Sequence, residues 1–268
     1  MQRYSLADYF RAAELPTVPE FSEQVPMLRV PFEHQLGDLG HLAKFTRSGL
    51  WNEPGCGKTM PVQAYGLWLA GQGNKVVFIM PPVLVLQFAG TLQRSYPGYA
   101  DYITSAVFQG TPKAREKLAE SWGGDWPDLL IMSFKMFVQY HKELKDKHGY
   151  TCVVVDEATS VKSPSSQLHN AVKAFGGNHR ENSNGIVLMT GSPIDTNVID
   201  AYGLIATVTP DRYGSKKMFE RLLLAAMKER AKLADIDDET RSNILVNKKG
   251  AMISPFFIDQ YFGQFTRR

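Results

Sequence analysis

The sequence predicts an α/β protein built on a parallel sheet with helices on both faces. Between residues 29 and 210, short apolar runs alternate with longer runs of helical periodicity. The apolar runs are continuous, which is typical of strands buried on both faces of a sheet. The most apolar segment, residues 76–89, is interrupted by two prolines and falls short of the roughly 18 apolar residues of a membrane span.

The elements follow one another in a regular order. The predicted strands are 49–51, 75–80, 102–108, 128–132, 151–156 and 186–190. The predicted helices are 31–43, 58–70, 83–95, 111–122, 134–147, 167–175 and 198–208. Ligands of such sheets bind at the carboxyl ends of the strands, so we expect the functional residues there.

The flanking segments differ from this pattern. Residues 1–28 contain three prolines and no sustained period, which predicts an extension that packs on the domain or is partly disordered. Residues 29–210 form the predicted sheet domain. A long helical run at 216–234 predicts that residues 211–268 are a small helical appendage.

Composition limits the cellular context. The net charge of +3 is mild, and the 12 Lys and Arg against 8 Asp and Glu in residues 211–268 suit either a phosphate backbone or a solvated helix. Two cysteines make no disulfide framework, and the amino terminus lacks the apolar core of a signal peptide. We expect a cytoplasmic protein, or a nuclear one in a eukaryote, without a membrane partner.

Residues 52–59 read Asn-Glu-Pro-Gly-Cys-Gly-Lys-Thr and lie between a short apolar run and a predicted helix. Glycines let the backbone N–H groups wrap around phosphate oxygens, and the helix N-terminus adds its dipole. This predicts a phosphate-binding loop in which Lys58 lies between the β- and γ-phosphates of ATP and Thr59 ligates Mg²⁺. The general pattern has a glycine where this chain has Asn52, so the match is to a shorter form of the loop.

An acidic pair, Asp156-Glu157, follows the apolar run 152–155. Nucleotide hydrolysis needs a metal ligand and a group that positions the attacking water. Adjacent residues at a strand end point in different directions, so we assign the Mg²⁺ role to Asp156 and the water role to Glu157.

With these motifs the sequence resembles the first RecA-like lobe of Swi/Snf-type ATPases, the helicase-like DNA translocases of superfamily two. Residues 31–35 resemble the glutamine motif that reads adenine, and 52–59 resemble D-E-x-G-x-G-K-T. Residues 156–159 stand where the family has D-E-A-H, and 161–164 resemble I-K-N-P. Downstream, 190–197 resemble T-G-T-P-I-x-N-N, and 210–219 resemble P-x-x-F-G-S-x-x-x-F.

The resemblance implies a set of site residues and partners. It implies catalytic roles for Lys58, Asp156 and Glu157, and ATP binding by Gln35, Pro54, Gly55, Cys56, Gly57, Lys58 and Thr59. It implies coupling between the nucleotide and DNA sites through Thr190, Gly191 and Ser192, and DNA contacts by Gln87, Ser133, Lys162 and Asn197. ATP and Mg²⁺ are the implied cofactors, and double-stranded DNA and a second RecA-like lobe are the implied partners.

Two departures from the family pattern affect function. Thr159 replaces the histidine of D-E-A-H, which puts the coupling between the ATP and nucleic-acid sites in doubt. Nothing in the sequence resembles the second lobe, which in this family supplies the arginine finger and half of the DNA track. Loss of an arginine finger costs on the order of 10³–10⁵ in rate, so we expect ATP binding with very slow hydrolysis.

Alternative functions stay open at this point. One is another superfamily-two enzyme, such as a strand-separating helicase or a restriction motor subunit, against which the block at 213–215 argues. Another is a non-enzymatic module whose nucleotide occupancy regulates a partner. The departure at Thr159 favours that module, whereas the intact phosphate loop and acidic pair argue against it.

Overall fold

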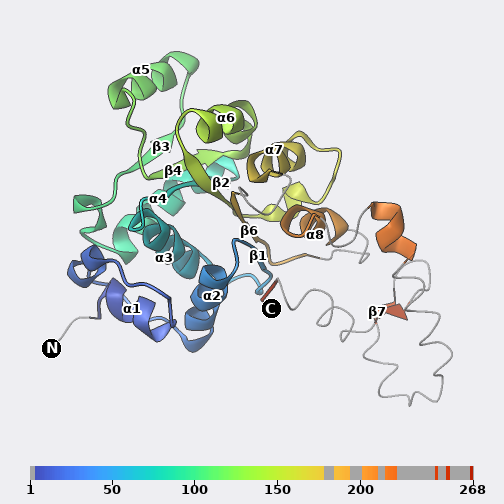
Figure 1. Ribbon diagram of the computed structural model, residues 1–268, viewed down its shortest axis with the longest axis horizontal. Helices are drawn as coiled ribbons and strands as arrows, with labels where there is room; N and C mark the ends of the chain where they lie inside the picture. Colours follow the sequence, from blue (N-terminus) through green and yellow to red (C-terminus); the bar gives the residue numbers. More distant parts are fainter. Residues whose placement is uncertain are drawn as a thin grey trace.

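The computed structural model (Figure 1) has a central sheet with the strand order β3-β4-β2-β5-β6-β1-β9. It describes residues 4–177, 184–193, 201–210 and 215–221, together with the backbone of three two-residue strands near the carboxyl terminus. The main strands are β1 Arg47–Leu50, β2 Lys75–Met80, β3 Ser105–Phe108, β4 Leu129–Ser133, β5 Tyr150–Val155 and β6 Gly185–Met189. All of their pairings are parallel, as the sequence predicts.

Helices cover both faces of the sheet, as Figure 1 shows. The α-helices are α1 Leu6–Ala12, α2 Glu33–Lys44, α3 Thr59–Ala70, α4 Val85–Ser95, α5 Pro112–Trp122, α6 Phe134–Asp146, α7 Gln167–Gly176 and α8 Tyr202–Val208. The 3₁₀ helices are η1 Glu20–Gln24, η2 Pro82–Leu84, η3 Tyr99–Asp101 and η4 Ala158–Val161. Among the helices that the structure describes, none is long and apolar enough to cross a bilayer.

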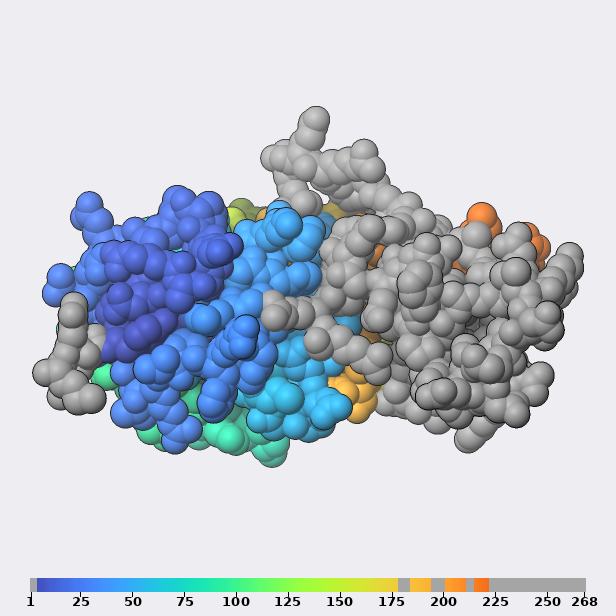
Figure 2. Space-filling model, turned by 90° about the horizontal axis from the view of Figure 1, so that it is seen from below, coloured from blue at the N-terminus to red at the C-terminus, as the bar shows by residue number. Residues whose placement is uncertain are grey.

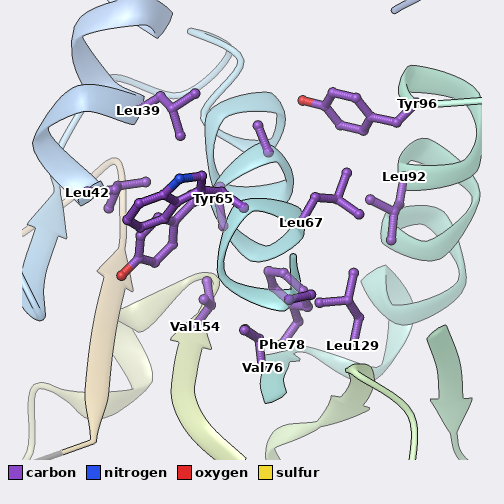
Figure 3. Packing of buried hydrophobic residues seen from close by; sticks show 14 of the residues in the cluster. Leu39, Leu42, Tyr65, Leu67, Val76, Phe78, Leu92, Tyr96, Leu129 and Val154 are labelled. Carbon is purple, nitrogen blue, oxygen red and sulfur yellow. The ribbon is translucent and has the colours of Figure 1, made fainter. Parts of the chain in front are cut away.

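The strand period of two divides the core between the two faces. Along β2, the side chains of Val76, Phe78 and Met80 join a cluster with α1 to α4, whereas Val77 and Ile79 join a cluster with α6 to α8. Figure 3 shows the first cluster, in which Phe78 lies between helices α3 and α4. Because β2 is buried on both sides, a one-residue slip of its register would exchange the two cores.

The starts of two strands, β3 and β1, differ from the sequence prediction by more than one residue. β3 begins at Ser105 rather than at 102, because residues 99–101 form η3 and the Thr104 hydroxyl and N–H both bond the Asp128 carboxylate. β1 begins earlier than predicted, at Arg47, whose guanidinium donates to the carbonyls of Gly176 and Gly177. A charged residue can occupy this strand because its guanidinium reaches polar partners.

The amino-terminal segment is part of the first core cluster. Leu6, Tyr9 and Phe10 on α1 are fully buried, and Ser5 caps this helix by accepting the Asp8 N–H at 3.1 Å. Farther on, the Trp68 indole N–H of α3 donates to the Thr17 carbonyl at 2.9 Å. Figure 2 shows the dark-blue amino-terminal residues lying directly against the lighter blue segment that follows them. The described part of residues 1–28 therefore packs on the sheet domain.

Beyond residue 210 the described residues are few. Residues 216–221 are helical, as expected, whereas most of the predicted run 216–234 lies outside the described residues. Three short strands that the sequence reading did not include are β7 Leu245–Val246, β8 Met252–Ile253 and β9 Thr266–Arg267. β7 pairs antiparallel with β8, and β9 pairs parallel with β1 at the edge of the sheet. The expected helical appendage thus contains strand pairs as well.

Gly203 is the position where α8 approaches the turn after the acidic pair most closely. A Cβ atom at residue 203 would lie 1.9 Å from the Lys162 carbonyl oxygen, and backbone cannot move away as a side chain can. We expect Gly203→Ala to lower the free energy of unfolding by at least about 2 kcal/mol. Chemical denaturation measures this against Gly124→Ala, where nothing lies within 4 Å of the added carbon. Equal stability of the two variants would contradict the close packing of α8.

His169 on α7 is buried and contacts the turn that follows the acidic pair. Its Nδ1 lies 3.0 Å from the Val161 carbonyl oxygen at the end of η4. Burial lowers the His169 pKa from 6.5; the nearby Lys173 also lowers it, whereas the bond to Val161 opposes the shift. The folded protein therefore binds this proton less readily than the unfolded chain does.

His169 therefore lowers the free energy of unfolding as the pH falls below about 6.5, and this loss continues until the pH reaches the pKa of the folded state. We expect His169→Asn, whose amide can still donate to Val161, to lose less stability between pH 7.5 and pH 5.5 than the wild type. Denaturation curves at both pH values measure the difference. An identical pH dependence in the two proteins would show that His169 is not responsible.

Candidate nucleotide site

Three functional segments lie at the carboxyl ends of three neighbouring strands. The phosphate loop follows β1, residues 190–192 follow β6, and Asp156 follows β5. Backbone bonds continue the pairing past the strand ends: Thr190 N–H donates to Leu50 O at 3.2 Å, and Asp156 N–H donates to Ile79 O at 2.9 Å. Because the strands are parallel and in adjacent positions, the predicted site residues meet at one edge of the sheet.

The phosphate loop has the backbone conformation that its glycines permit. Gly55 and Gly57 have φ values of +85° and +76°, in the left-handed region that disfavours side chains. Helix α3 begins directly after them, at Thr59. Pro54, Gly55 and Gly57 are exposed, and Cys56 is half-buried at the helix N-terminus. The loop is therefore open to a ligand and faces the positive end of the α3 dipole.

Lys58 lies over this loop. Its ammonium donates to the Asn52 carbonyl at 2.7 Å and to the Glu53 carbonyl at 2.9 Å. Its charge also lowers the pKa of Asp156, against the effect of burial. The cation thus lies within electrostatic reach of both the loop and the acidic pair, where an anionic ligand would meet it.

Asp156 is partly buried, and desolvation raises its pKa above 3.8. The carboxylate of Glu157 raises it further, whereas the Glu157 N–H, which donates to Asp156 Oδ1 at 2.9 Å, and Lys58 lower it. A divalent cation would favour the ionised carboxylate and reverse this shift. The electrostatic surroundings of Asp156 therefore suit a cation ligand.

Glu157 is exposed and has a left-handed backbone, with φ +53°. A left-handed non-glycine residue costs on the order of 1–2 kcal/mol. Glu157 precedes η4, and its N–H donates to Asp156 Oδ1 at 2.9 Å. The two acidic residues differ in their surroundings, since Asp156 is half-buried and Glu157 is exposed.

Residues 190–192 connect the phosphate loop to the turn after the acidic pair. A Cβ atom at Gly191 would lie 2.7 Å from the Pro54 ring, so only glycine allows this close approach. The buried Thr190 hydroxyl accepts the Ser192 N–H at 3.1 Å, and Lys162 donates to the Ser192 carbonyl. Thr159 is half-buried, and its hydroxyl bonds the Glu157 carbonyl at 3.4 Å.

Gln35 is 5% exposed and contacts backbone at the site. Its Nε2 donates to the Gly57 carbonyl at 3.0 Å, and its Oε1 accepts the Phe32 N–H at 2.9 Å. A Cβ at Gly57 would lie 2.6 Å from Nε2, so a side chain there would push the Gln35 amide away from its present position. The Gln35 side chain on α2 therefore contacts the phosphate loop, and its recognition of adenine stays a prediction.

Three of the residues predicted to contact DNA, Gln87, Ser133 and Lys162, lie in the described part of the chain. Gln87 is exposed on α4, and Ser133 ends β4 beside a hollow of about 210 Å³ that Gln109, Gly110 and Arg115 also line. Lys162 instead reaches Ser192, and Asn197 lies outside the described residues. Ser133 and Arg115 thus line one hollow, whereas Lys162 contacts Ser192 in the segment 190–192.

The sequence did not predict the contacts of four residues in this region, Tyr9, Asp38, Asn52 and Arg115. Asn52 Nδ2 donates to Asp38 Oδ2 at 2.7 Å, and both residues are buried. The available signal was an acidic residue at 38 on the apolar face of the predicted helix, three positions after Gln35. For Arg115, the signal was its place in the first turn after Thr111-Pro112, the start of a helix that follows a strand.

The residues suit Mg²⁺ bound together with a phosphate ligand. Magnesium in nucleotide sites takes one or two protein ligands and fills its other positions with phosphate oxygens and water. The Thr59 hydroxyl and the Asp156 carboxylate are oxygen donors of this kind, at the start of α3 and the end of β5. In the described part of the chain, no group of three or more His, Cys, Asp or Glu forms a metal site by itself.

Comparison with known proteins identifies relatives that are much longer. The TATA-binding protein-associated factor MOT1 of Saccharomyces cerevisiae is 28% identical over 144 residues, or 54% of this chain and 7% of MOT1. The chromatin-remodeling ATPase INO80 of Cryptococcus neoformans is 28% identical over 202 residues, or 70% of this chain and 11% of INO80. An uncharacterized ATP-dependent helicase of Mycoplasma genitalium is 28% identical over 201 residues, covering 74% of this chain and 17% of that protein.

The fold is also that of a solved structure, the Sulfolobus solfataricus SWI2/SNF2 ATPase core in complex with double-stranded DNA. The TM-score is 0.62 at 17% identity, and the match covers 90% of this chain and 45% of that chain. The profile of the SNF2-related domain matches residues 41–260. The chain therefore belongs to the SNF2-related domain family, as the order of its motifs predicts.

Proposed function

We propose that this chain is the ATP-binding and hydrolysing lobe of a Swi/Snf-like double-stranded DNA translocase. The observation that carries the proposal is the meeting of the phosphate loop, the acidic pair and residues 190–192 on adjacent strands β1, β5 and β6. A phosphate-binding loop beside two carboxylates, one half-buried and one exposed, suits phosphoanhydride hydrolysis, which needs a metal ligand and a group that positions water. The proposed substrate is ATP, and the proposed partners are DNA and a second lobe.

Each side chain then has a distinct role. The loop N–H groups and Lys58 bind the phosphates, since the Lys58 ammonium can exchange its two carbonyl partners for phosphate oxygens. Thr59 and Asp156 hold Mg²⁺, which when bound neutralises charge on the β- and γ-phosphates. Glu157, exposed beside them, orients the attacking water. The Gln35 amide has two N–H groups, of which one bonds Gly57. We propose that the second N–H recognises adenine.

The proposed DNA track runs along the same edge of the sheet. The hollow lined by Ser133 and Arg115 offers a hydroxyl and a guanidinium, groups that bind phosphate, and Gln87 is exposed on α4. Contacts of this kind read backbone rather than bases, so binding should be largely independent of sequence and should weaken as salt rises. The Sulfolobus ATPase core of the same fold was solved with double-stranded DNA.

We propose that rapid hydrolysis needs a second lobe. The chain spans less than a fifth of each of the three long relatives described above. An arginine supplied from outside the lobe would stabilise the charge that develops in phosphoryl transfer, an effect on the order of 10³–10⁵ in rate. Closure of the two lobes on ATP would then drive movement along the DNA backbone.

Steady-state ATPase assays of this chain test the proposal, with and without double-stranded DNA. We expect Mg·ATP binding with turnover near background, because the lobe alone lacks the external arginine. Glu157→Gln should bind ATP as the wild type does and abolish the residual rate, whereas Lys58→Ala should weaken binding. A fast, DNA-stimulated rate that depends on Glu157 would contradict the need for a second lobe, and absence of ATP binding would overturn the nucleotide site.

Alkylation of Cys56 gives a second test that needs no turnover. Both cysteines are free thiols, but only Cys56 is accessible, since Cys152 is 2% exposed. We expect iodoacetamide to modify Cys56 alone and to block nucleotide binding, and Mg·ATP to protect the thiol. Peptide mass spectrometry locates the label, and Mg²⁺ without nucleotide is the matched control. Equal labelling with and without Mg·ATP would contradict nucleotide binding at this loop.

A further inference from the structure

Helix α2 presents two buried polar side chains to the phosphate loop. Gln35 and Asp38 are 5% and 1% exposed, and they lie three positions apart, on one face of the helix. A buried glutamine and a buried carboxylate are costly to desolvate unless they find partners. Their partners therefore show what the two side chains do.

Each of the two side chains bonds the phosphate loop, one at each end of it. At the carboxyl end, Gln35 Nε2 donates to the Gly57 carbonyl at 3.0 Å. At the amino end, Asp38 Oδ2 accepts the Asn52 Nδ2–H at 2.7 Å. Residues 53–55 between them are exposed, so these two bonds join the ends of the loop to buried side chains of α2.

The amino-terminal helix supports α2 at the same point. The Tyr9 side chain on α1 is fully buried, and its hydroxyl donates to the Gln35 backbone carbonyl at 3.0 Å. Burial, followed by the charges of Tyr96 and Asp38, raises the Tyr9 pKa, so the phenol keeps its proton and remains a donor. Tyr9 thus touches the residue that holds one end of the loop and lies within electrostatic reach of the residue that holds the other.

We propose that Gln35 and Asp38 are positioning residues that hold the two ends of the phosphate loop, and that Tyr9 fixes them from the amino-terminal segment. Residues 4–28 then contribute to nucleotide affinity, although they lie before residues 41–260, which match the family. The inference rests on the proposed function only in taking the ligand of the loop to be a nucleotide.

The same contact explains why an amide stands at position 52. The related motif D-E-x-G-x-G-K-T begins with a carboxylate at this place. A carboxylate at 52 would face the carboxylate of Asp38 in a buried setting, where two ionised carboxylates would repel each other. Asn52 instead donates an N–H to Asp38.

Exchange of the two partners tests the proposal. Asn52→Asp removes the donor, and adding Asp38→Asn restores one hydrogen bond with its direction reversed. We expect Asn52→Asp to weaken binding of the fluorescent probe Mg·mant-ADP by about tenfold or more, and the double variant to recover to within about threefold of the wild type. Asn74→Asp, at the opposite end of the sheet, is the matched control, and Tyr9→Phe should weaken binding by a smaller factor.

A second readout separates this inference from the proposed function. The rate at which Cys56 is alkylated without nucleotide reports how well ordered the loop is. This rate should rise in Asn52→Asp and fall back to the wild-type value in the double variant. Asp38→Leu should act like Asn52→Asp, and it replaces that variant if the latter does not fold. Failure of the wild type to bind Mg·mant-ADP overturns the proposed function. In contrast, a Cys56 alkylation rate equal to that of the wild type in both Asn52→Asp and Asp38→Leu overturns the positioning role. A double variant no better than Asn52→Asp, at equal thermal stability, also overturns it.

Discussion

The parallel pairing of β5, β6 and β1 is the constraint on which the site depends. Strands in a parallel pair end at the same edge, so residues far apart in the sequence are brought together without any contact between their helices. The β6–β1 pairing continues beyond the strand ends through the Thr190 N–H to Leu50, and the β5–β2 pairing does so through the Asp156 N–H to Ile79. Burial of β2, β5 and β6 on both faces fixes this register, because a slip would exchange the apolar residues of two separate cores.

Around this edge, the local conformations are specialised and costly. Two left-handed glycines shape the phosphate loop, and a left-handed glutamate follows β5. Gly191 and Gly203 let neighbouring backbone and ring atoms approach closer than a Cβ would permit. Such features persist only where surrounding structure holds them, and here the surroundings are α2 beneath the loop and α7 and α8 beneath the acidic turn. The helices of both faces therefore contribute to one site.

Much of the fold and part of the site could be predicted from the sequence. The continuous apolar runs identified the six main strands, since burial on both faces leaves a strong signal, and the motif order identified the family. The sequence could not show that Lys162 reaches Ser192 or that Asn52 meets Asp38, because these contacts join segments 14 or more residues apart through single side chains. The packing of residues 4–28 was also open, since short helices with prolines between them carry little periodicity.

The place of α2 has a practical consequence for dissecting this protein. The match to the family profile begins at residue 41, near the end of α2, so a fragment cut at the start of that match would lose Gln35, Asp38 and the whole of α1. It would keep every residue of the phosphate loop and still lack the groups that hold its two ends. It would also lose Leu6, Tyr9 and Phe10, which belong to the same buried cluster as Val62, Ala64 and Leu67 of α3. A fragment that keeps both held ends of the loop together with Tyr9 must therefore begin before α1, well ahead of the first residue of the family match.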